Sequence, residues 1–230
     1  MRRGRLIALE GIDGAGTTTQ ARLLVDWLVD QQQPAYLTCE PSRGEVGILL
    51  RTLLAGDGDR AVMALLFAAD RLDHLRREIE PHLDRGAHVV TDRYVYSSLA
   101  YQGMDLGLEW TASLNRLAPE PDLTIYLHVD PAVAAHRRAG RGSMAETFET
   151  DPQQERIALF YNDFFGSDPG AGSWRLDPGG SEWIRADPPA RPALATVDRQ
   201  PRWAVLDGCL DVDMLHDQIR KVAAKICALP

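Results

Sequence analysis

Short apolar segments rich in β-forming residues recur along the chain, and each predicts a strand of a parallel sheet. The first covers residues 6–9 and stops at the charged residue Glu10. Runs of this length are typical of strands that are buried on both faces. The other segments of this kind lie at 35–38, 88–91, 123–129 and 203–207. The pattern therefore predicts a central parallel sheet of about five strands.

Helical patterns, with apolar residues three or four positions apart, fill the intervals between the predicted strands. The expected helices cover 21–28, 47–54, 62–85, 109–117, 131–138, 152–165 and 212–227. Alternation of strand and helix implies right-handed crossovers and helices on both faces of the sheet. We therefore expect a three-layer α/β fold in a single domain that spans 1–230. Ligands in such folds bind at the carboxyl ends of the strands.

The stretch 166–202 breaks this alternation. It is dense in glycine and proline, and residues 177–180 read Asp-Pro-Gly-Gly, which is typical of turns rather than of a regular element. Three interpretations are open: a disordered insertion, a flap packed through Trp174 and Trp183, or an element that touches a nucleotide donor. Because exposed tryptophans are costly, we favour the packed flap.

A glycine-rich loop follows the first predicted strand and precedes a predicted helix. Residues 11–20 read GIDGAGTTTQ, which aligns with the phosphate-binding pattern G-x-x-x-x-G-K-[ST]. Backbone N–H groups of such a loop and the start of the following helix cradle phosphate. The alignment puts Thr17 at the position of the lysine and Thr18 at the hydroxyl that holds Mg²⁺. The expected ATP-binding residues are Gly11, Gly14, Ala15, Gly16, Thr17, Thr18 and Thr19.

An acidic residue and an arginine, Asp92 and Arg93, follow the third predicted strand. A carboxylate at this edge of a sheet can hold Mg²⁺ directly or through water, and a guanidinium can fork onto phosphate. Taken alone, such a pair at a strand end is more often a surface ion pair. Combined with the glycine-rich loop and with Ser-Ser-x-Ala-Tyr-Gln-Gly at 97–103, it indicates a nucleotide site.

Composition narrows the classes of partner. The net charge is −8 and the isoelectric point is about 5.2, which argues against general binding of nucleic-acid polymers or membranes. Cys39, Cys209 and Cys227 are scattered and odd in number, which suits a reducing, cytoplasmic location rather than a disulfide framework or a zinc site. The first apolar run is too short for a signal peptide, and no run approaches the ~20 apolar residues of a membrane span.

Motifs in a fixed order make the chain resemble the thymidylate kinases, a branch of the P-loop nucleoside monophosphate kinases. The motifs are residues 13–20 of the loop, Glu40-Pro41, Phe67-Ala68-Ala69-Asp70-Arg71, the block 92–103 and Pro121-Asp122-Leu123-Thr124. The resemblance runs from about residue 6 to 165 and resumes at 203. It implies ATP- and Mg²⁺-dependent phosphorylation of dTMP to dTDP. The nearest alternative is a kinase for a different nucleoside monophosphate.

Position by position, the resemblance implies roles in binding the acceptor nucleotide. Phe67 would lie against the thymine ring, Arg71 would donate to a base carbonyl, and Gln102 would meet the base edge. Tyr101 would crowd the 2′ position of the sugar. From the residues alone, a core Phe67, a surface Arg71 and a packed Tyr101 are also open. The implied substrate-binding set is Glu40, Arg51, Phe67, Arg71, Arg93, Ser98, Tyr101 and Gln102.

The resemblance also implies a catalytic set of carboxylates and arginines. Asp13 would contact the sugar 3′-hydroxyl or the metal shell, and Arg93 would clamp the acceptor phosphate together with Arg51. Thr18 and Asp92 would hold the metal. A basic lid is expected at about 137–152. The residues expected to act in catalysis are Asp13, Asp92, Arg93, Arg137 and Arg141.

Three positions depart from the family pattern. Thr17 replaces the loop lysine, Cys39 replaces an arginine before Glu-Pro, and Thr147 replaces a lid arginine. Losing a cation at the donor phosphates without replacement would reduce catalysis strongly, by analogy with the roughly 10³–10⁵-fold effect of an arginine finger. The lid arginines Arg137, Arg138 and Arg141 could supply that cation. We therefore favour an active kinase over a catalytically impaired nucleotide-binding relative.

The apolar helix around residues 63–66 offers a face for a homodimer of the kind common in the family. Burial of the same face against the sheet is an equal alternative.

Overall fold

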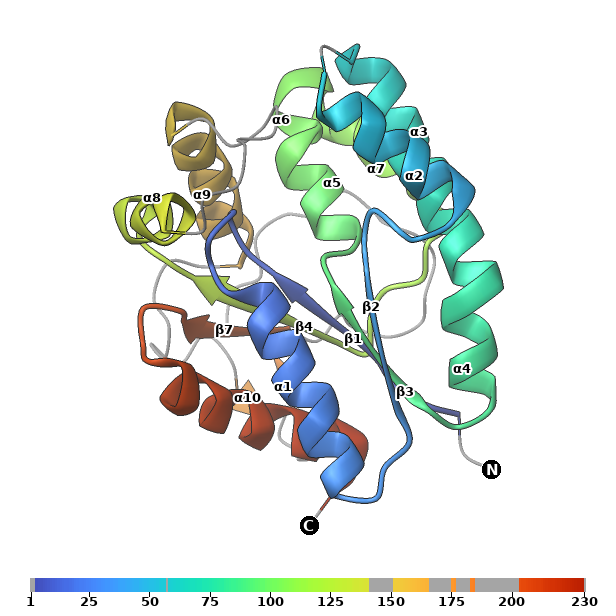
Figure 1. Ribbon diagram of the computed structural model, residues 1–230, viewed down its shortest axis with the longest axis vertical. Coiled ribbons are helices and arrows are strands. Elements are labelled where there is room, and N and C mark those ends of the chain that lie inside the picture. Colours follow the sequence, from blue (N-terminus) through green and yellow to red (C-terminus); the bar gives the residue numbers. More distant parts are fainter. Residues whose placement is uncertain are drawn as a thin grey trace.

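Five parallel strands in the order β2-β3-β1-β4-β7 form the central sheet of the computed structural model (Figure 1). The structure describes residues 3–56, 58–140, 151–165, 175–176, 183–184 and 203–229. The strands are β1 Leu6–Glu10, β2 Ala35–Cys39, β3 His88–Asp92, β4 Leu123–His128 and β7 Trp203–Asp207. Each strand begins where the apolar pattern predicts and ends within one residue of the predicted end. The predicted fold class is confirmed.

The register of the sheet brings the predicted site segments to one edge. Leu9 of β1 pairs with Asp92 of β3, and Cys39 of β2 pairs with Asp92 from the other side. Because the strands are parallel, the segments that follow them leave from the same edge. The glycine-rich loop, Glu40 and Arg93 are therefore neighbours in space although they are far apart in sequence.

Helices cover both faces of the sheet. Helices α1 (Thr17–Asp30) and α10 (Val212–Cys227) pack against each other on one face (Figure 1). Among the helices between β2 and β3, β3 and β4, and β4 and β7, α8 (Pro131–Ala139) packs on the glycine-rich loop, and right-handed crossovers place the others on the other face. The others are α2 Glu45–Leu54, α3 Arg60–His74, η1 Leu75–Ile79, α4 Glu80–Asp84, α5 Val95–Tyr101, α6 Gly103–Leu106, α7 Leu108–Leu114 and α9 Asp151–Phe165.

Two short helices, α5 and α6, were not predicted from the sequence. Helix α5 is buried along nearly its whole length, so it has no polar face to produce amphipathic spacing. The predicted helix at 62–85 is a continuous helical segment made of α3, the π-helical turn η1 and α4. The predicted helix at 109–117 ends at Leu114, before the expected residue.

Aromatic rings fix α9 against the sheet. Tyr161 stacks on Tyr126 of β4 with the ring centroids 5.1 Å apart, and the ring of Phe165 lies 5.3 Å from that of Tyr126. All three side chains are buried, and stacked rings add to the stability gained from burial. Helix α9 is thereby held beside the sheet at a fixed position.

Most of the predicted excursion at 166–202 lies outside the described residues. Within it the structure describes two short strands, β5 (Arg175–Leu176) and β6 (Trp183–Ile184), which pair in antiparallel fashion. The predicted packing of Trp174 lies outside the described residues. Where the structure is described, no helix has the length and apolar character needed to cross a membrane.

Candidate active site

Nearly all the residues expected to bind the acceptor nucleotide line one cavity of about 190 Å³. We call it the apolar cavity. Every member of the predicted substrate-binding set lines it except Arg51. Its lining residues are Asp13, Glu40, Pro41, Leu54, Phe67, Arg71, Arg93, Tyr94, Ser97, Ser98, Tyr101 and Gln102. Half-buried Phe67 and buried Tyr101 both line this space, and Tyr101 belongs to the hydrophobic core while Phe67 packs against it, so lining and packing occur together.

A second cavity, of about 280 Å³, lies over the glycine-rich loop, and we call it the loop cavity. Of the predicted ATP-binding residues, Gly11 and Ala15 do not line it: Ala15 is buried, and the carbonyl of Gly11 accepts a hydrogen bond from Arg93. Arg137 reaches this cavity from α8. The lining residues are Asp13, Gly14, Gly16, Thr17, Thr18, Thr19, Arg93 and Arg137.

A third cavity, of about 340 Å³, lies over the ends of β2 and β3, and we call it the arginine cavity. Arg22, Arg43 and Arg51 line it together with Cys39. Burial raises the pKa of the Cys39 thiol, and nearby Asp92 adds to this effect, so the thiol is neutral. The lining residues are Thr18, Arg22, Tyr36, Leu37, Thr38, Cys39, Glu40, Pro41, Arg43, Arg51, Glu78, Asp92 and Arg93.

Arg93 lines all three cavities. Its guanidinium donates to the Gly11 carbonyl at 2.9 Å and to Asp13 Oδ1 at 2.6 Å, and it lies 5.1 Å from the centre of the Tyr101 ring. Its backbone has φ of 71°, in the left-handed region that non-glycine residues rarely adopt. A cation held in this way at the junction of three cavities can contact ligands in each of them.

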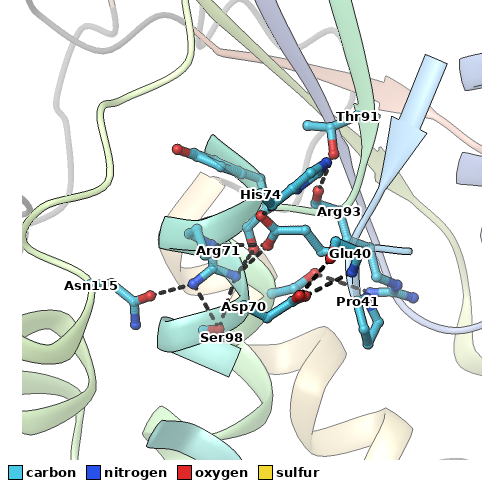
Figure 2. A network of polar contacts seen from close by, with 12 residues as sticks. Glu40, Pro41, Asp70, Arg71, His74, Thr91, Arg93, Ser98 and Asn115 are labelled. Atoms are coloured by element: carbon cyan, nitrogen blue, oxygen red, sulfur yellow. Dashed lines mark hydrogen bonds and ion pairs between the residues drawn. The ribbon is translucent and has the colours of Figure 1, made fainter. Parts of the chain in front are cut away.

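Arg71 is buried in a polar network rather than placed on the surface, so the surface alternative is wrong (Figure 2). Its Nε and one terminal nitrogen donate to Glu40 Oε2 at 2.9 and 2.6 Å. The remaining N–H groups find acceptors in the Tyr94 carbonyl, the Ser98 hydroxyl and the Asn115 side chain. An arginine has five N–H donors, and all five have protein acceptors here. To donate to a base, Arg71 would have to give up one of these hydrogen bonds to a protein acceptor.

His74 lies beside Glu40 and was not expected to belong to the site (Figure 2). It is fully buried, its Nε2 lies 2.7 Å from Thr38 Oγ1, and its Nδ1 lies 3.4 Å from Glu40 Oε1. Burial alone would lower the pKa of His74, but Glu40 and the charges of Glu78 and Asp70 raise it overall. Protonated His74 therefore helps to balance the buried charge of Glu40.

This pKa shift predicts how stability changes with pH. A group with a raised folded-state pKa contributes stability that is complete below its unfolded pKa of about 6.5 and is lost as pH rises through the folded pKa. His74→Gln should therefore be less stable than the wild type in mild acid, and the difference should shrink as pH rises. Urea unfolding of both proteins across this range measures it. A difference that does not vary with pH would contradict the assignment of charge to His74.

Helix α8 packs directly on the glycine-rich loop. Gly14 has φ of 96°, and a Cβ there would lie 2.5 Å from the Ala134 carbonyl oxygen, so only glycine fits. Arg138 donates to the Asp13 carbonyl at 2.6 Å, and Arg137 donates to the Gly208 carbonyl at 2.9 Å. This packing places the basic end of α8 at the loop.

Gln154, in the first turns of α9, holds the same loop from the other side. Its Oε1 accepts the N–H of Asp13 at 2.9 Å, and its Nε2 donates to Asp13 Oδ2 at 2.7 Å. The two helices that flank 141–150 thus both bond Asp13. Arg141 and Thr147, the other lid positions considered, lie outside the described residues.

Thr18 and Asp92, the expected metal ligands, are in direct contact. The Thr18 hydroxyl donates to Asp92 Oδ2, whereas Asp92 Oδ1 is buried and has no hydrogen-bond partner among the described residues. A carboxylate oxygen and a hydroxyl are hard donors that suit Mg²⁺. Within the described part of the chain, no cluster of three or more His, Cys, Asp or Glu could hold a metal alone. This donor set fits an ion that takes its other ligands from nucleotide phosphates and water.

Sequence reasoning missed four residues of this region. Arg43 and Asn115 belong to no motif: Arg43 lines the same cavity as Cys39, and Asn115 accepts a hydrogen bond from Arg71. His74 lies one helical turn after Arg71, so its spacing was the available signal for it. Gln154 belongs to no motif used above, and its contact with Asp13 spans 141 residues of the chain.

Comparisons with known proteins agree with this geometry. A family model described as thymidylate kinase matches residues 9–169. A curated protein of Pyrococcus abyssi, named "Probable thymidylate kinase", is 43% identical over 167 residues, which cover 69% of this chain and 82% of that protein. A protein of the same name from Pyrococcus horikoshii is 44% identical with the same coverage. Another from Thermococcus onnurineus is 41% identical over 166 residues, covering 67% of this chain and 81% of its own length.

Proposed function

This chain belongs to the thymidylate kinase family, and we propose that it transfers the γ-phosphoryl group of ATP to dTMP, giving dTDP. The observation that carries this proposal is the meeting of the three cavities at Arg93. The apolar cavity would take the nucleoside of dTMP, the loop cavity the phosphates of ATP, and the arginine cavity the acceptor phosphate. Transfer would then occur beside Arg93.

The apolar cavity has the chemistry needed to select thymine. Phe67 supplies an aromatic face, which any base can share. Gln102 supplies selectivity, since its Oε1 is buried and has no hydrogen-bond partner among the described residues. This oxygen is suited to accept the N3–H of thymine, a donor that cytosine lacks. A buried acceptor left without a donor is costly, so the wrong base is rejected.

Gln102→Leu should therefore raise KM for dTMP by about tenfold or more and weaken the preference for dTMP over dCMP. Leucine keeps the volume of the side chain and removes the acceptor. Steady-state kinetics with both nucleotides measures the change. We choose Gln102 over Arg71 because Arg71→Ala would remove the main partner of the buried Glu40 carboxylate, and breaking a buried ion pair costs about 3–5 kcal/mol in stability. An unchanged dTMP preference in Gln102→Leu would contradict this account of base selection.

Tyr101 and Asp13 would meet the sugar. The two residues line the same cavity, and Arg93 contacts both. The Asp13 carboxylate is held in position by Arg93 and Gln154. We assign it to the 3′-hydroxyl, and Tyr101 to the exclusion of a 2′-hydroxyl.

Arg93, Arg43 and Arg51 would hold the acceptor phosphate. Arg51 also donates to the Pro41 carbonyl at 2.7 Å, which fixes it beside the turn after β2. Arg43 lines the same cavity as Cys39 and supplies a cation close to the position where the family has arginine. The departure at Cys39 therefore does not leave the cavity without positive charge.

The donor phosphates would lie against the N–H groups of the glycine-rich loop and the start of α1. Thr18 and Asp92 would hold Mg²⁺, which when bound offsets charge on the transferring phosphoryl group. Arg137 supplies the cation that Thr17 cannot. No residue needs to form a covalent intermediate, because the acceptor phosphate attacks in line. The work of this chain is positioning and charge stabilisation.

A paired experiment tests the proposal. Turnover is measured with ATP and Mg²⁺ on dTMP, dUMP, UMP, CMP and AMP, and binding of dTMP and ATP is measured by calorimetry. We expect dTMP to be the preferred acceptor. Clear preference for AMP or CMP would overturn the choice of substrate. Tight binding without any product would instead identify a non-catalytic nucleotide-binding protein, which the missing loop lysine makes the second candidate.

Helices α2 and α3 pack on each other, and both carry exposed apolar residues that a homodimer would cover. Ile48 and Leu49 of α2 and Val62 and Leu65 of α3 are each about half exposed, whereas Met63 and Ala64 are buried in the core. We predict a dimer through these exposed residues and expect Leu65→Glu to yield monomers, because a charge there would be buried at the interface. Light scattering over a concentration series measures the mass. A concentration-independent monomer in the wild type would reject the dimer.

A further inference from the structure

Glu10 is a fully buried carboxylate that lines none of the three cavities. Its Oε1 accepts N–H bonds from Tyr94 at 3.0 Å and from Ser97 at 3.3 Å. Its Oε2 accepts O–H bonds from Ser97 at 2.6 Å and from Tyr161 at 2.9 Å. Four neutral donors from two other elements therefore converge on one side chain at the end of β1.

Two of these bonds supply the cap that α5 lacks. Tyr94 precedes α5, and no side chain at this position caps the helix. The N–H groups of Tyr94 and Ser97, at the start of the helix, bond to Glu10 instead. A negative charge at a helix N-terminus is also favoured by the helix dipole. Glu10 thus ties the start of α5 to the edge of the sheet.

The same carboxylate is linked to both the backbone and the side chain of Arg93. The left-handed backbone of Arg93 is held by its own N–H, which bonds the Leu9 carbonyl at 2.9 Å, and by the next N–H, of Tyr94, which bonds Glu10. The guanidinium of Arg93 donates to the Ser97 hydroxyl at 3.2 Å, and that hydroxyl donates its own proton to Glu10. Backbone and side chain of Arg93 are therefore each one contact away from Glu10.

We propose that Glu10 is the positioning residue for Arg93: it locks the turn between β3 and α5 and orients the Ser97 hydroxyl, so that the guanidinium stays at the junction of the three cavities. The inference rests on the proposed function, in which Arg93 binds the acceptor phosphate. Tyr161 of α9 also donates to Glu10, which links Glu10 to the helix that bonds the glycine-rich loop through Gln154.

Glu10→Gln tests this role because it keeps the shape of the side chain and one acceptor oxygen. Its amide N–H₂ cannot accept the Ser97 and Tyr161 hydroxyl protons. In the proposed function Arg93 binds the phosphate and not the base, so calorimetry compares dTMP with thymidine, which lacks the phosphate. We expect the Kd of dTMP to rise about tenfold. The Kd of thymidine should stay within about twofold of the wild type, because Gln154 still holds the Asp13 carboxylate that is assigned to the sugar.

Tyr161→Phe provides a second variant that removes one hydroxyl from the same carboxylate. It should show a smaller loss of the same kind, confined to dTMP. Tyr126→Phe is the matched control, since its hydroxyl bonds Asn162 at 3.0 Å within the same aromatic stack and does not bond Glu10. We expect Tyr126→Phe to bind both ligands as the wild type does.

A pH series adds a readout that simple packing would not change. Burial raises the pKa of Glu10 to about 7, although the Ser97 bond and the Arg93 charge oppose this rise. The other titratable groups that face it are Tyr161 from α9 and Tyr126, its partner in register on β4. In the wild type the preference for dTMP over thymidine should fall as pH drops through about 7. In Glu10→Gln this preference should change with pH only through protonation of the dTMP phosphate, near pH ~6.

Two results would overturn the role of Glu10. One is an equal loss of dTMP and thymidine binding in Glu10→Gln, and the other is the same loss in Tyr126→Phe as in Tyr161→Phe. Failure of the wild type to bind dTMP at all would overturn the proposed function itself, so the two failures are distinguishable. If Glu10→Gln does not fold, the comparison of Tyr161→Phe with Tyr126→Phe decides the question.

Discussion

Arg93→Ala should lower kcat/KM for dTMP by about 10³-fold or more, the largest effect we expect from any single substitution. Arg93 lines all three cavities. In the proposed function its loss would therefore remove a cation from the acceptor phosphate and from the transferring group together. It also leaves Asp13 without its 2.6 Å partner. Steady-state kinetics over a range of dTMP concentrations, with ATP saturating, measures the effect.

Two further variants separate the charge of Arg93 from its geometry. Arg93→Lys keeps the charge but loses the planar fork, so it should recover only part of the activity. Arg77→Ala removes an arginine that is largely exposed and pairs with Asp73, and it should leave kinetics near those of the wild type. Activity of Arg93→Ala within about tenfold of the wild type would mean that phosphoryl transfer does not take place at this junction.

The fold could be read from the sequence because buried parallel strands leave a local pattern. The apolar segment before Glu10 and the segment at 203–207 each gave the strand directly, since both faces of the sheet are covered. Helix α5 escaped prediction for the related reason that it is buried on nearly every side and therefore lacks an amphipathic pattern.

Most residues that line the apolar cavity could also be predicted from the sequence, but the hydrogen bonds between them could not. The motifs predicted that Arg71 and Gln102 bind the same ligand, and both line one cavity. No local pattern predicts that all five N–H groups of Arg71 donate to acceptors within the protein. Its acceptors Glu40 and Asn115 are 31 and 44 residues away in the chain. Contacts of such separation depend on the packing of α3 against neighbouring elements, which only the three-dimensional structure reveals.

We propose that a cation supplied from α8 compensates for the missing loop lysine. Thr17 lines the loop cavity and carries no charge, and Arg137 lines the same cavity. The packing of α8 on Gly14 keeps that arginine near the loop. If Arg137 takes over the role of the lysine, its contact with the donor phosphates strengthens in the transition state, and its loss should reduce kcat more than it raises KM for dTMP.

We therefore expect Arg137→Ala to lower kcat by about 10²- to 10³-fold with little change in KM for dTMP. Thr17→Lys should then restore most of the lost rate in the Arg137→Ala background, because the family's cation would return to the same cavity. In the wild-type background it should have a much smaller effect, so the two substitutions would be strongly non-additive. Thr17→Ala in both backgrounds is the control for loss of the threonine itself. Wild-type kcat in Arg137→Ala, or equal effects of Thr17→Lys in the two backgrounds, would show that Arg137 does not replace the lysine.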